Sequence, residues 1–426
     1  MVDRGGVDQA VWAEHDPAAR FRDTRWAEAD VTRLRAELDR IDPGSIHAQA
    51  HAALISAVSG DRSRAGTQIA RLLEVPACRS AQLAYWDRHA IGNAVFHALD
   101  LDLLGRLLGA WSEADATVWV GLRPASAIPV DPWIASWELD GRGASSFLFH
   151  PAILSSARLR HCIPRFVDAV PLFTEIVRRN PSVRGRVAVT LADVATFPGL
   201  GFSANDPAVC LLPDHEFVRS RGYETFKFES SSAQPPWRDR MRAALWRGSA
   251  YGPLAAGFRA LQRVRLCEAA LGSELLDAGL TSGGDFPPDD QAAMQSAGLF
   301  RAPVPAVQQS QWKYLIDVDG YSNSWAGLFQ KLYSASTVIK IASPAGYRQW
   351  YYERLRPWEN YVPVEADLSD MVDKVNWLRA HDDEAQRIGK RGRNLALSMT
   401  FETELRYAEA AVIDRFTRDA GGPRRS

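Results

Sequence analysis

Apolar and polar stretches alternate between residues 313 and 341 in a way that predicts one compact structural unit. We expect a buried strand over residues 314–318, a polar loop over 319–324, an amphipathic helix over 325–335 and a second buried strand over 337–341. This order is typical of parallel α/β sheets, which bind ligands at the carboxyl ends of strands, beside helix amino termini. The polar loop is therefore the first candidate site, and a phosphate-bearing ligand would suit it.

The rest of the chain divides into a helical part and a mixed part. The first 110 residues are rich in alanine, leucine and arginine, with apolar residues at helical spacing over 31–41 and 67–75 and breaks near residues 42–44 and Pro76. Strands and further helices follow. The predicted strands are 116–122, 186–193, 208–214, 244–249, 263–269 and 361–364, and the predicted late helices are 368–382, 384–398 and 402–418.

Strands mixed with helices predict an α/β fold with two domains. A Ser/Pro-rich connection at 230–236 separates them, and residues 285–291 read as irregular. We expect this division of the chain: a helical region (1–110), a first α/β domain (111–235), a second α/β domain (236–400), a carboxyl-terminal helix (401–420) that packs back across the domains, and a disordered tail (421–426).

Charge and composition narrow the function. The chain has 426 residues, enough for two cores, and 50 Lys and Arg against 51 Asp and Glu. This balance argues against a nucleic-acid partner held by bulk electrostatics. No apolar run approaches the roughly 18 residues of a membrane span or suggests a leader, so we expect a cytoplasmic protein, with peripheral membrane contact left open. The four cysteines lie far apart, which favours buried thiols over disulfides or a zinc site.

The segment WRGS, Trp246 to Ser249, is a candidate phosphate-binding block at a predicted strand end. An arginine such as Arg247 can meet phosphate with two parallel N–H bonds. Gly248 would allow close backbone approach, and the Ser249 hydroxyl would donate to a phosphate oxygen. The alternative is a surface arginine in a turn.

The segment DVDG offers two carboxylates, Asp317 and Asp319, which share one face of the predicted strand end. They would bind a metal and diphosphate, bind ribose hydroxyls, or orient Arg247. The alternative is that Asp319 and Gly320 form only a tight turn.

Two lysines and a helix start complete the candidate phosphate site. Asn323 or Ser324 would cap the helix and leave first-turn N–H groups for an anion. Lys331 lies in that helix and Lys340 in the following apolar strand. The alternatives are an exposed helix lysine and an edge-strand lysine. Nearby aromatic residues would stack on a ligand ring or belong to the core: Tyr347, Trp350, Tyr351, Tyr352 and Trp358.

Four blocks in order give the chain a family resemblance: PPWRDRMRAALWRGSAYG, DVDGYSNSWAGLFQKL with VIK, YRQWYYERLRPWENYVPV and WLRAHDDEAQRIGKRG. Together they resemble glycosyltransferase family 90, which holds protein O-glucosyltransferases, fungal capsule-associated proteins and bacterial lipopolysaccharide-type transferases. The resemblance is strong over about 186–392 and weak before about 153. It implies two Rossmann-like domains facing a cleft (GT-B type). Since we expect no leader, the chain looks like the bacterial branch.

The resemblance also implies an activity and roles for residues. It implies an inverting transfer of glucose or xylose from a UDP-sugar to a hydroxyl of a glycan, lipid-linked or small-molecule acceptor, without a cofactor, although a divalent metal stays open. Asp193 would be the catalytic base, with Asp206 and Asp214 as rivals. Eukaryotic members carry an arginine in the helix that here holds Lys331, which would substitute for it. The rival interpretation is a non-catalytic carbohydrate- or nucleotide-binding protein.

Overall fold

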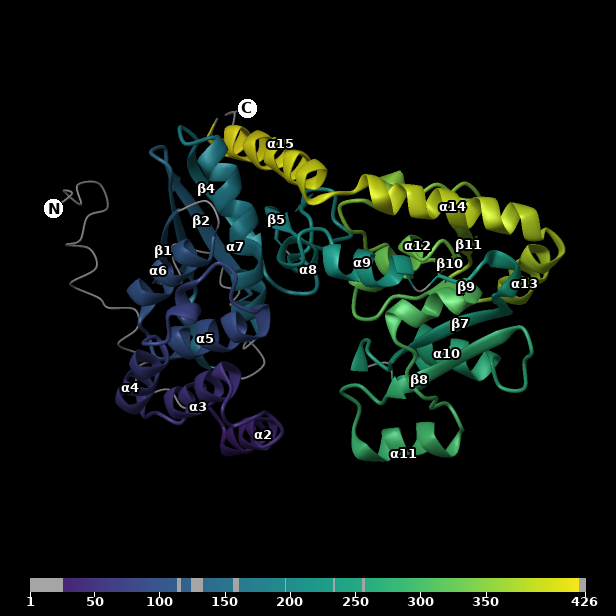
Figure 1. Ribbon diagram of the computed structural model, residues 1–426, viewed down its shortest axis with the longest axis horizontal. Coiled ribbons are helices and arrows are strands. Elements are labelled where there is room, and N and C mark those ends of the chain that lie inside the picture. Colours follow the sequence, from purple (N-terminus) through teal and green to yellow (C-terminus); the bar gives the residue numbers. More distant parts are fainter. Residues whose placement is uncertain are drawn as a thin grey trace, which may run out of the picture. The chain divides into compact units, whose positions relative to one another are not determined.

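The computed structural model describes residues 26–112, 116–123, 133–155, 161–195, 197–232, 234–254 and 257–420 (Figure 1). It has a mixed α/β fold with two sheets, as predicted. Two compact units share the chain, and each crosses the predicted domain borders. Unit 1 comprises Met1–Gly201, Ala208–Cys210 and Glu409–Ser426, and unit 2 comprises Phe202–Pro207 and Leu211–Ala408. The predicted disordered tail, 421–426, lies outside the described residues.

Unit 1 begins with helices, as the apolar spacing predicts. They are α2 (Glu28–Leu38), α3 (Ile46–Val58), α4 (Arg62–Leu72), α5 (Tyr85–His97) and α6 (Leu101–Trp111). Side-chain oxygens of Ser45, Asp61 and Asp100 accept hydrogen bonds from first-turn N–H groups and so start α3, α4 and α6. The predicted break at Pro76 is the start of a short 3-10 helix, where the proline ring fits the first position.

The sheet of unit 1 has six strands in the order β1-β3-β2-β4-β5-β6. They are β1 (Thr117–Leu122), β2 (Ile134–Asp140), β3 (Ala144–Phe149), β4 (Arg184–Thr190), β5 (Leu200–Gly201) and β6 (Cys210–Leu211). Strand β2 runs antiparallel to both β3 and β4, whereas a Rossmann-like sheet is parallel. The short turn after Asp140, with Gly141 and Gly143 at positive φ, makes β2 and β3 a hairpin, so this sheet differs from the expectation.

Helix α7 (Cys162–Arg179) supplies much of the core of unit 1. Its Phe173 packs against Trp137 of β2 at 4.6 Å between ring centroids, and Phe416 packs against the same indole at 5.3 Å. Phe416 belongs to α15 (Phe401–Ala420), whose residues from Glu409 onward count with unit 1.

The sheet of unit 2 is entirely parallel. Its strands are β7 (Met241–Ser249), β8 (Leu276–Ser282), β9 (Trp312–Asp317), β10 (Thr337–Ile341) and β11 (Val362–Val364), in the order β11-β10-β9-β7-β8. The first strand, β7, lies between the second and the third, so the strand order reverses between β7 and β9. In a doubly wound sheet such a switch point marks the crevice where ligands bind.

The helices of unit 2 include four that the sequence analysis does not predict. These four are α8 (His215–Arg219), α9 (Glu224–Ser232), α10 (Gln262–Ala269) and α11 (Pro288–Ser296), and the predicted ones are α12 (Ala326–Tyr333), α13 (Met371–Ala380) and α14 (Asp382–Ser398). The prediction of a strand over 263–269 is wrong, because this segment is α10, the crossover that joins the parallel strands β7 and β8. The stretch predicted as irregular, 285–291, contains the start of α11.

Side chains alternate across the strands of unit 2 and build two cores. Ile339 belongs to a cluster with α10 and α13, whereas Val338 packs with Leu328 and Phe329 of α12. Lys340 alternates with Ile339 and therefore lies on the α12 face of the sheet. Figure 1 shows α12 and α10 along the strands of this unit.

Two expectations from composition concern the whole chain. Cys78, Cys162 and Cys267 are buried free thiols, as predicted, and Cys210 is a partly buried one. Among the helices that the structure describes, none is both long and apolar enough to cross a membrane.

Candidate functional site at the sheet switch point

Asp317, at the end of β9, is the centre of a buried cluster. Its side chain is fully buried, and its Oδ1 accepts hydrogen bonds from Ser324 Oγ at 2.6 Å and Lys331 Nζ at 2.9 Å. Its Oδ2 accepts from Lys340 Nζ at 2.9 Å. The strand register pairs Lys340 with Asp317, and α12 covers the face on which both lie. The structure therefore brings together three of the predicted site residues around a fourth.

Electrostatics fix the charges of this cluster. Burial alone would raise the pKa of Asp317, but Lys331 and Lys340 hold that pKa below its usual range. Burial would lower the pKa of Lys340, yet Asp317 and Asp319 raise it. Both groups are therefore charged at neutral pH. The edge-strand alternative for Lys340 is wrong, since β10 lies between β9 and β11, and the exposed-lysine alternative for Lys331 is wrong, since Lys331 is buried.

Asp319 lies next to the cluster, and its two carboxylate oxygens accept no hydrogen bond from the described residues. The carboxylate is buried and lies 3.6 Å from Lys340 Nζ. Burial raises the pKa of this carboxyl, while Lys340 opposes the rise. A buried polar group without a partner is costly, so Asp319 is suited to a ligand hydroxyl or an ordered water.

The loop after β9 also presents main-chain donors. Within the described residues, the N–H groups of Asp319, Gly320, Ser322, Asn323 and Ser324 have no hydrogen-bond acceptor. Several of these residues are buried, so their N–H groups need a ligand or water. The loop is thus a row of donors at the switch point.

The start of α12 differs from the predicted cap. Ser324 donates its hydroxyl to Asp317 and Asn323 binds other partners, so neither side chain caps the helix. The N-cap is Trp325, with φ 51° and no side-chain cap bond. A bulky residue at positive φ is strained and marks a constrained loop. The prediction that Asn323 or Ser324 caps the helix is wrong, although first-turn N–H groups still lack a side-chain cap.

Arg247 does not join the cluster. Its Nη2 donates to Asp277 Oδ1 at 2.6 Å, and its other bonds go to the carbonyl oxygens of Trp246, Asp277 and Ala302. The side chain is 10% exposed. The Arg247 guanidinium thus binds the neighbouring strand β8 and the segment after it, and the idea that Asp317 or Asp319 orients it is wrong.

The other residues of this block are packed against each other. The Trp246 indole is buried, and a Cβ on Gly248 would come 2.7 Å from Trp246 Cζ2. Gly248 is therefore required by the tryptophan, independently of any ligand. Ser249 ends β7, and its carbonyl oxygen accepts from Arg263 Nη1 at 2.9 Å.

The three candidate bases have different surroundings. Strand β4 ends at Thr190, so Asp193 follows it in a loop of unit 1, where Arg165 Nη2 donates to its Oδ1 at 2.6 Å and the side chain is 36% exposed. Asp206 is exposed. Asp214 is fully buried and caps α8, and burial raises its pKa to about 6. Asp214 is therefore inaccessible to an acceptor.

Aromatic and arginine residues of the third sequence block are mainly structural. Trp350 and Tyr351 belong to the core with α12, as the core interpretation predicts. The Lys340 ammonium lies over the Tyr352 ring at 4.9 Å from its centroid. Arg354 pairs with the buried Glu404.

The sequence analysis misses Arg263 and assigns a different role to Asn323. Arg263 of α10 donates to the carbonyl oxygens of Ser249, Val318 and Asp319 and so joins the loops after β7 and β9. Asn323 accepts from Ser203 Oγ at 2.6 Å and donates to Tyr352 Oη at 3.3 Å. Arg263 falls in the segment misread as a strand, which hides its role.

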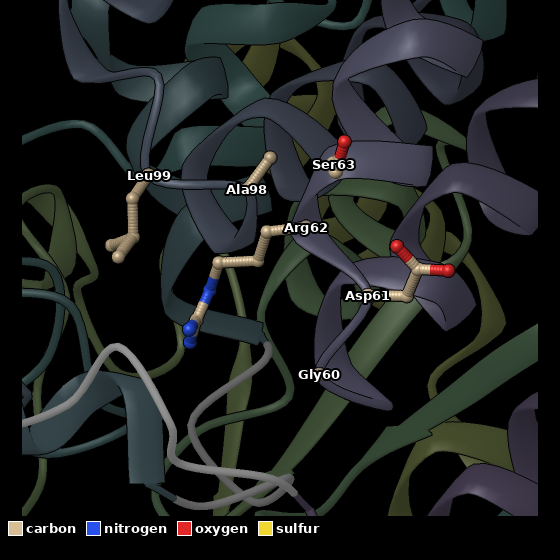
Figure 2. Close-up of a pocket in the computed structure, with 6 residues that line it drawn as sticks. All are labelled: Gly60, Asp61, Arg62, Ser63, Ala98 and Leu99. Atoms are coloured by element: carbon tan, nitrogen blue, oxygen red, sulfur yellow. The ribbon is translucent and has the colours of Figure 1, made fainter.

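Among the described residues, neither a metal-binding cluster nor a cavity adds a candidate site. No group of three or more His, Cys, Asp or Glu side chains in the described part of the chain could hold a metal ion. A shallow cavity of about 380 Å³ in unit 1 is lined by Gly60, Asp61, Arg62, Ser63, Ala98 and Leu99, none of them a predicted site residue. Figure 2 shows the Arg62 guanidinium and the Asp61 carboxylate pointing in different directions.

The parallel sheet with its switch-point loop defines unit 2 as a doubly wound α/β unit. Residues 213–407 match the model of the family described as Glycosyl transferase family 90. This segment is similar to members of that family, and it contains every predicted site residue except Asp193.

Three relatives each match less than half of the chain. Protein O-glucosyltransferase 3 of Rattus norvegicus is 31% identical over 197 residues, which are 43% of this chain and 35% of the relative. Protein O-glucosyltransferase 2 of Danio rerio is 31% identical over 162 residues, 38% of this chain and 30% of the relative. Uncharacterized protein 035R of Invertebrate iridescent virus 3 is 31% identical over 167 residues, 36% of this chain and 14% of the relative. The chain spans about a third or less of these relatives.

Proposed function

We propose that the protein is a glycosyltransferase whose unit 2 holds the diphosphate of a nucleotide-sugar donor at the loop after β9. One observation carries the proposal: within the described residues, the main-chain N–H groups of Asp319, Gly320, Ser322, Asn323 and Ser324 lack acceptors, at the switch point of a sheet in the segment that matches the family 90 model. Oriented N–H groups in such a loop bind phosphate oxygens with little reorganisation.

The charge beneath the loop supports an anionic ligand. Arg263, Lys331 and Lys340 are three cations, and Asp317 and Asp319 are two carboxyl groups, so three minus two leaves an excess of one positive charge. Lys331 and Lys340 therefore act through the field of the cluster while they bind Asp317, and Ser324 holds the loop to the same carboxylate.

The remaining predicted residues take supporting roles in this proposal. Trp246, Gly248 and Ser249 shape the end of β7, and Gly320 lets the loop lie close to Arg263. Asp319 would accept a donor hydroxyl group. Arg247 is left outside the diphosphate site because Asp277 and three carbonyl oxygens already bind it.

The donor would be a UDP-sugar, with glucose or xylose transferred and the anomeric configuration inverted. The names of the rat and zebrafish relatives contain O-glucosyltransferase, which supports glucose. Asp193, with its partly exposed side chain, would take the proton from the acceptor hydroxyl. The acceptor is a glycan, a lipid-linked precursor or a small molecule. The GT-B arrangement, the cytoplasmic location, peripheral membrane contact and a bacterial source stay predictions, and the relatives quoted above are vertebrate and viral.

We further propose that no divalent metal is needed. Both oxygens of Asp317 already accept hydrogen bonds from Ser324, Lys331 and Lys340, so this carboxylate would have to lose those partners to bind a metal. Full activity in excess EDTA is the expected result, and loss of activity that Mn²⁺ restores would contradict it.

Incubation with UDP-glucose or UDP-xylose, with and without acceptor extracts, tests the proposal through release of UDP. A transferase releases UDP slowly without acceptor because water replaces the acceptor hydroxyl. Failure of thermal shift to detect any nucleotide sugar would refute the donor site, since a ligand of the native state raises the melting temperature. Binding without any release would favour the non-catalytic alternative, which the engagement of both lysines by Asp317 also supports.

A further inference from the structure

Arg263 joins the two loops that flank the switch point. Its Nη1 donates to Ser249 O after β7 at 2.9 Å, its Nε to Asp319 O after β9 at 2.9 Å, and its Nη2 to Val318 O at 3.4 Å. The guanidinium also lies over the Trp246 ring at 5.7 Å. One planar side chain thus fixes the distance between two strand ends.

These contacts also orient the donors of the loop. In a trans peptide unit the carbonyl and the N–H point in opposite directions. Arg263 binds the carbonyl oxygens of Val318 and Asp319, so the N–H groups of Asp319 and Gly320 point away from the guanidinium. These two N–H groups are among those without an acceptor. Arg263 thereby keeps the N–H groups of Asp319 and Gly320 directed away from itself, where a phosphate could accept from them. It also holds the carbonyl oxygens of Val318 and Asp319, which would repel phosphate, on its own side of the loop.

Gly320 is fitted to the same side chain. A Cβ on this residue would lie 2.9 Å from Arg263 Nη2, closer than a carbon and a nitrogen tolerate. Gly320 does not have a positive φ, so the backbone conformation itself does not demand glycine. Glycine is required at this position because the Arg263 guanidinium lies so close.

We propose that Arg263 is a positioning residue for the donor site, which holds the loop so that its N–H groups face the diphosphate. The inference rests on the proposed function and adds to it a side chain that contacts only the protein. A flat fork is required, because Arg263 reaches the three carbonyl oxygens from three separate nitrogens, whereas the three donors of a lysine radiate from one nitrogen and cannot span the same acceptors.

Isothermal titration calorimetry of the full chain with UDP and with uridine tests the role. For Arg263→Gln we expect the dissociation constant of UDP to rise at least about tenfold, with that of uridine unchanged, because uridine has no phosphate. Arg263→Lys should weaken UDP binding to a similar degree. Gly320→Ala disturbs the same contact from the side of the loop and should also weaken UDP binding. This variant keeps the inference testable if the arginine variants do not fold.

Arg240 offers a matched control. It is a buried arginine that also binds main-chain oxygens, of Pro235 and Ser334, but it precedes β7 and so lies at the opposite edge of the sheet. Arg240→Gln should lower the melting temperature and leave UDP affinity unchanged. Unchanged UDP affinity in Arg263→Gln, equal losses of UDP and uridine affinity, or full affinity in Arg263→Lys would each overturn the inference. Absence of UDP binding by the unaltered protein would instead refute the proposed function, and the inference with it.

Discussion

The Lys340 ammonium lies 2.9 Å from Asp317 Oδ2, and the register of β9 and β10 sets these two residues side by side. Lys331 reaches the other carboxylate oxygen from α12. Buried ammonium groups need a nearby counter-charge, and Asp317 supplies the closest one to both lysines. The cluster is therefore one electrostatic unit, and its behaviour follows from the carboxylate.

Asp317→Asn should strongly destabilise unit 2, because it removes the carboxylate that binds the buried Lys331 and leaves Lys340 with only the more distant Asp319, at 3.6 Å. We expect a loss of about 3–5 kcal/mol in the free energy of unfolding, measured by urea denaturation at neutral pH. Glu384→Gln, which removes an exposed pair with Arg387, should cost no more than about 1 kcal/mol. Equal, small losses for both variants would show that the cluster is not a unit.

Asp214 should make stability depend on pH. Burial raises its folded pKa to about 6, above an unfolded value of about 3.9. The folded state then binds one more proton at Asp214 between these values, so the contribution of this group to stability is greatest below about pH 4 and falls as the pH rises to about 6. The difference is about 3 kcal/mol, at about 1.4 kcal/mol for each unit of pKa shift.

Asp214→Asn isolates this effect, because an asparagine still caps α8 and Gln349 can turn its unpartnered Oε1 toward the new amide. Relative to the unaltered protein, the variant should gain stability from pH 4 to pH 6 in urea titrations. Parallel pH profiles for the two proteins would contradict the buried-carboxyl interpretation.

Gly248→Ala should destabilise the end of β7, since the new methyl group would meet the Trp246 ring at 2.7 Å. We expect a loss of about 1–3 kcal/mol and a lower melting temperature. Gly66→Ala is the matched control, because Gly66 lies inside α4 with no atom near the added carbon. That change should stabilise the protein by about 0.5–1 kcal/mol. A neutral Gly248→Ala would mean that the indole moves freely.

Asp193→Asn should lower the rate of sugar transfer about 10²- to 10⁴-fold and leave donor affinity unchanged, as expected for loss of a general base outside the donor site. Steady-state kinetics with a competent acceptor, together with calorimetry for the donor, separates the two effects. Asp206→Asn is the comparison. If that variant loses transfer while Asp193→Asn does not, the base is assigned to the wrong carboxylate.

Local pattern predicts the central unit of the fold well. The strand over 337–341 is found as expected, and the strand before it begins two residues earlier and ends one residue earlier. Both strands are covered by other elements on each face of the sheet, so they consist of apolar runs. The polar loop between them makes their ends easy to recognise in the sequence. Residues 263–269 mislead because Val264 and Leu266 alternate with polar residues as in a strand, although the crossover between parallel strands makes the segment a helix.

The candidate site is less predictable, because it depends on where long side chains point. The spacing of Asp317, Lys331 and Lys340 suggests that they meet, and they do. The same reasoning predicts that Arg247 binds the ligand, whereas the Arg247 side chain binds Asp277 on the adjacent strand. The role of Arg263 cannot be predicted from the sequence, because its partners are main-chain oxygens. Every residue has such an oxygen, so the residue types around Arg263 do not indicate the contact.

Hydrogen exchange followed by mass spectrometry tests the central claim most directly. With UDP bound, the main-chain N–H groups of residues 319–324 should exchange more slowly than in the free protein, because phosphate oxygens become their acceptors. Peptides from α4, distant from the loop in sequence and in the other unit, should exchange at unchanged rates. UDP binding that protects other segments and leaves residues 319–324 unaffected would contradict the account.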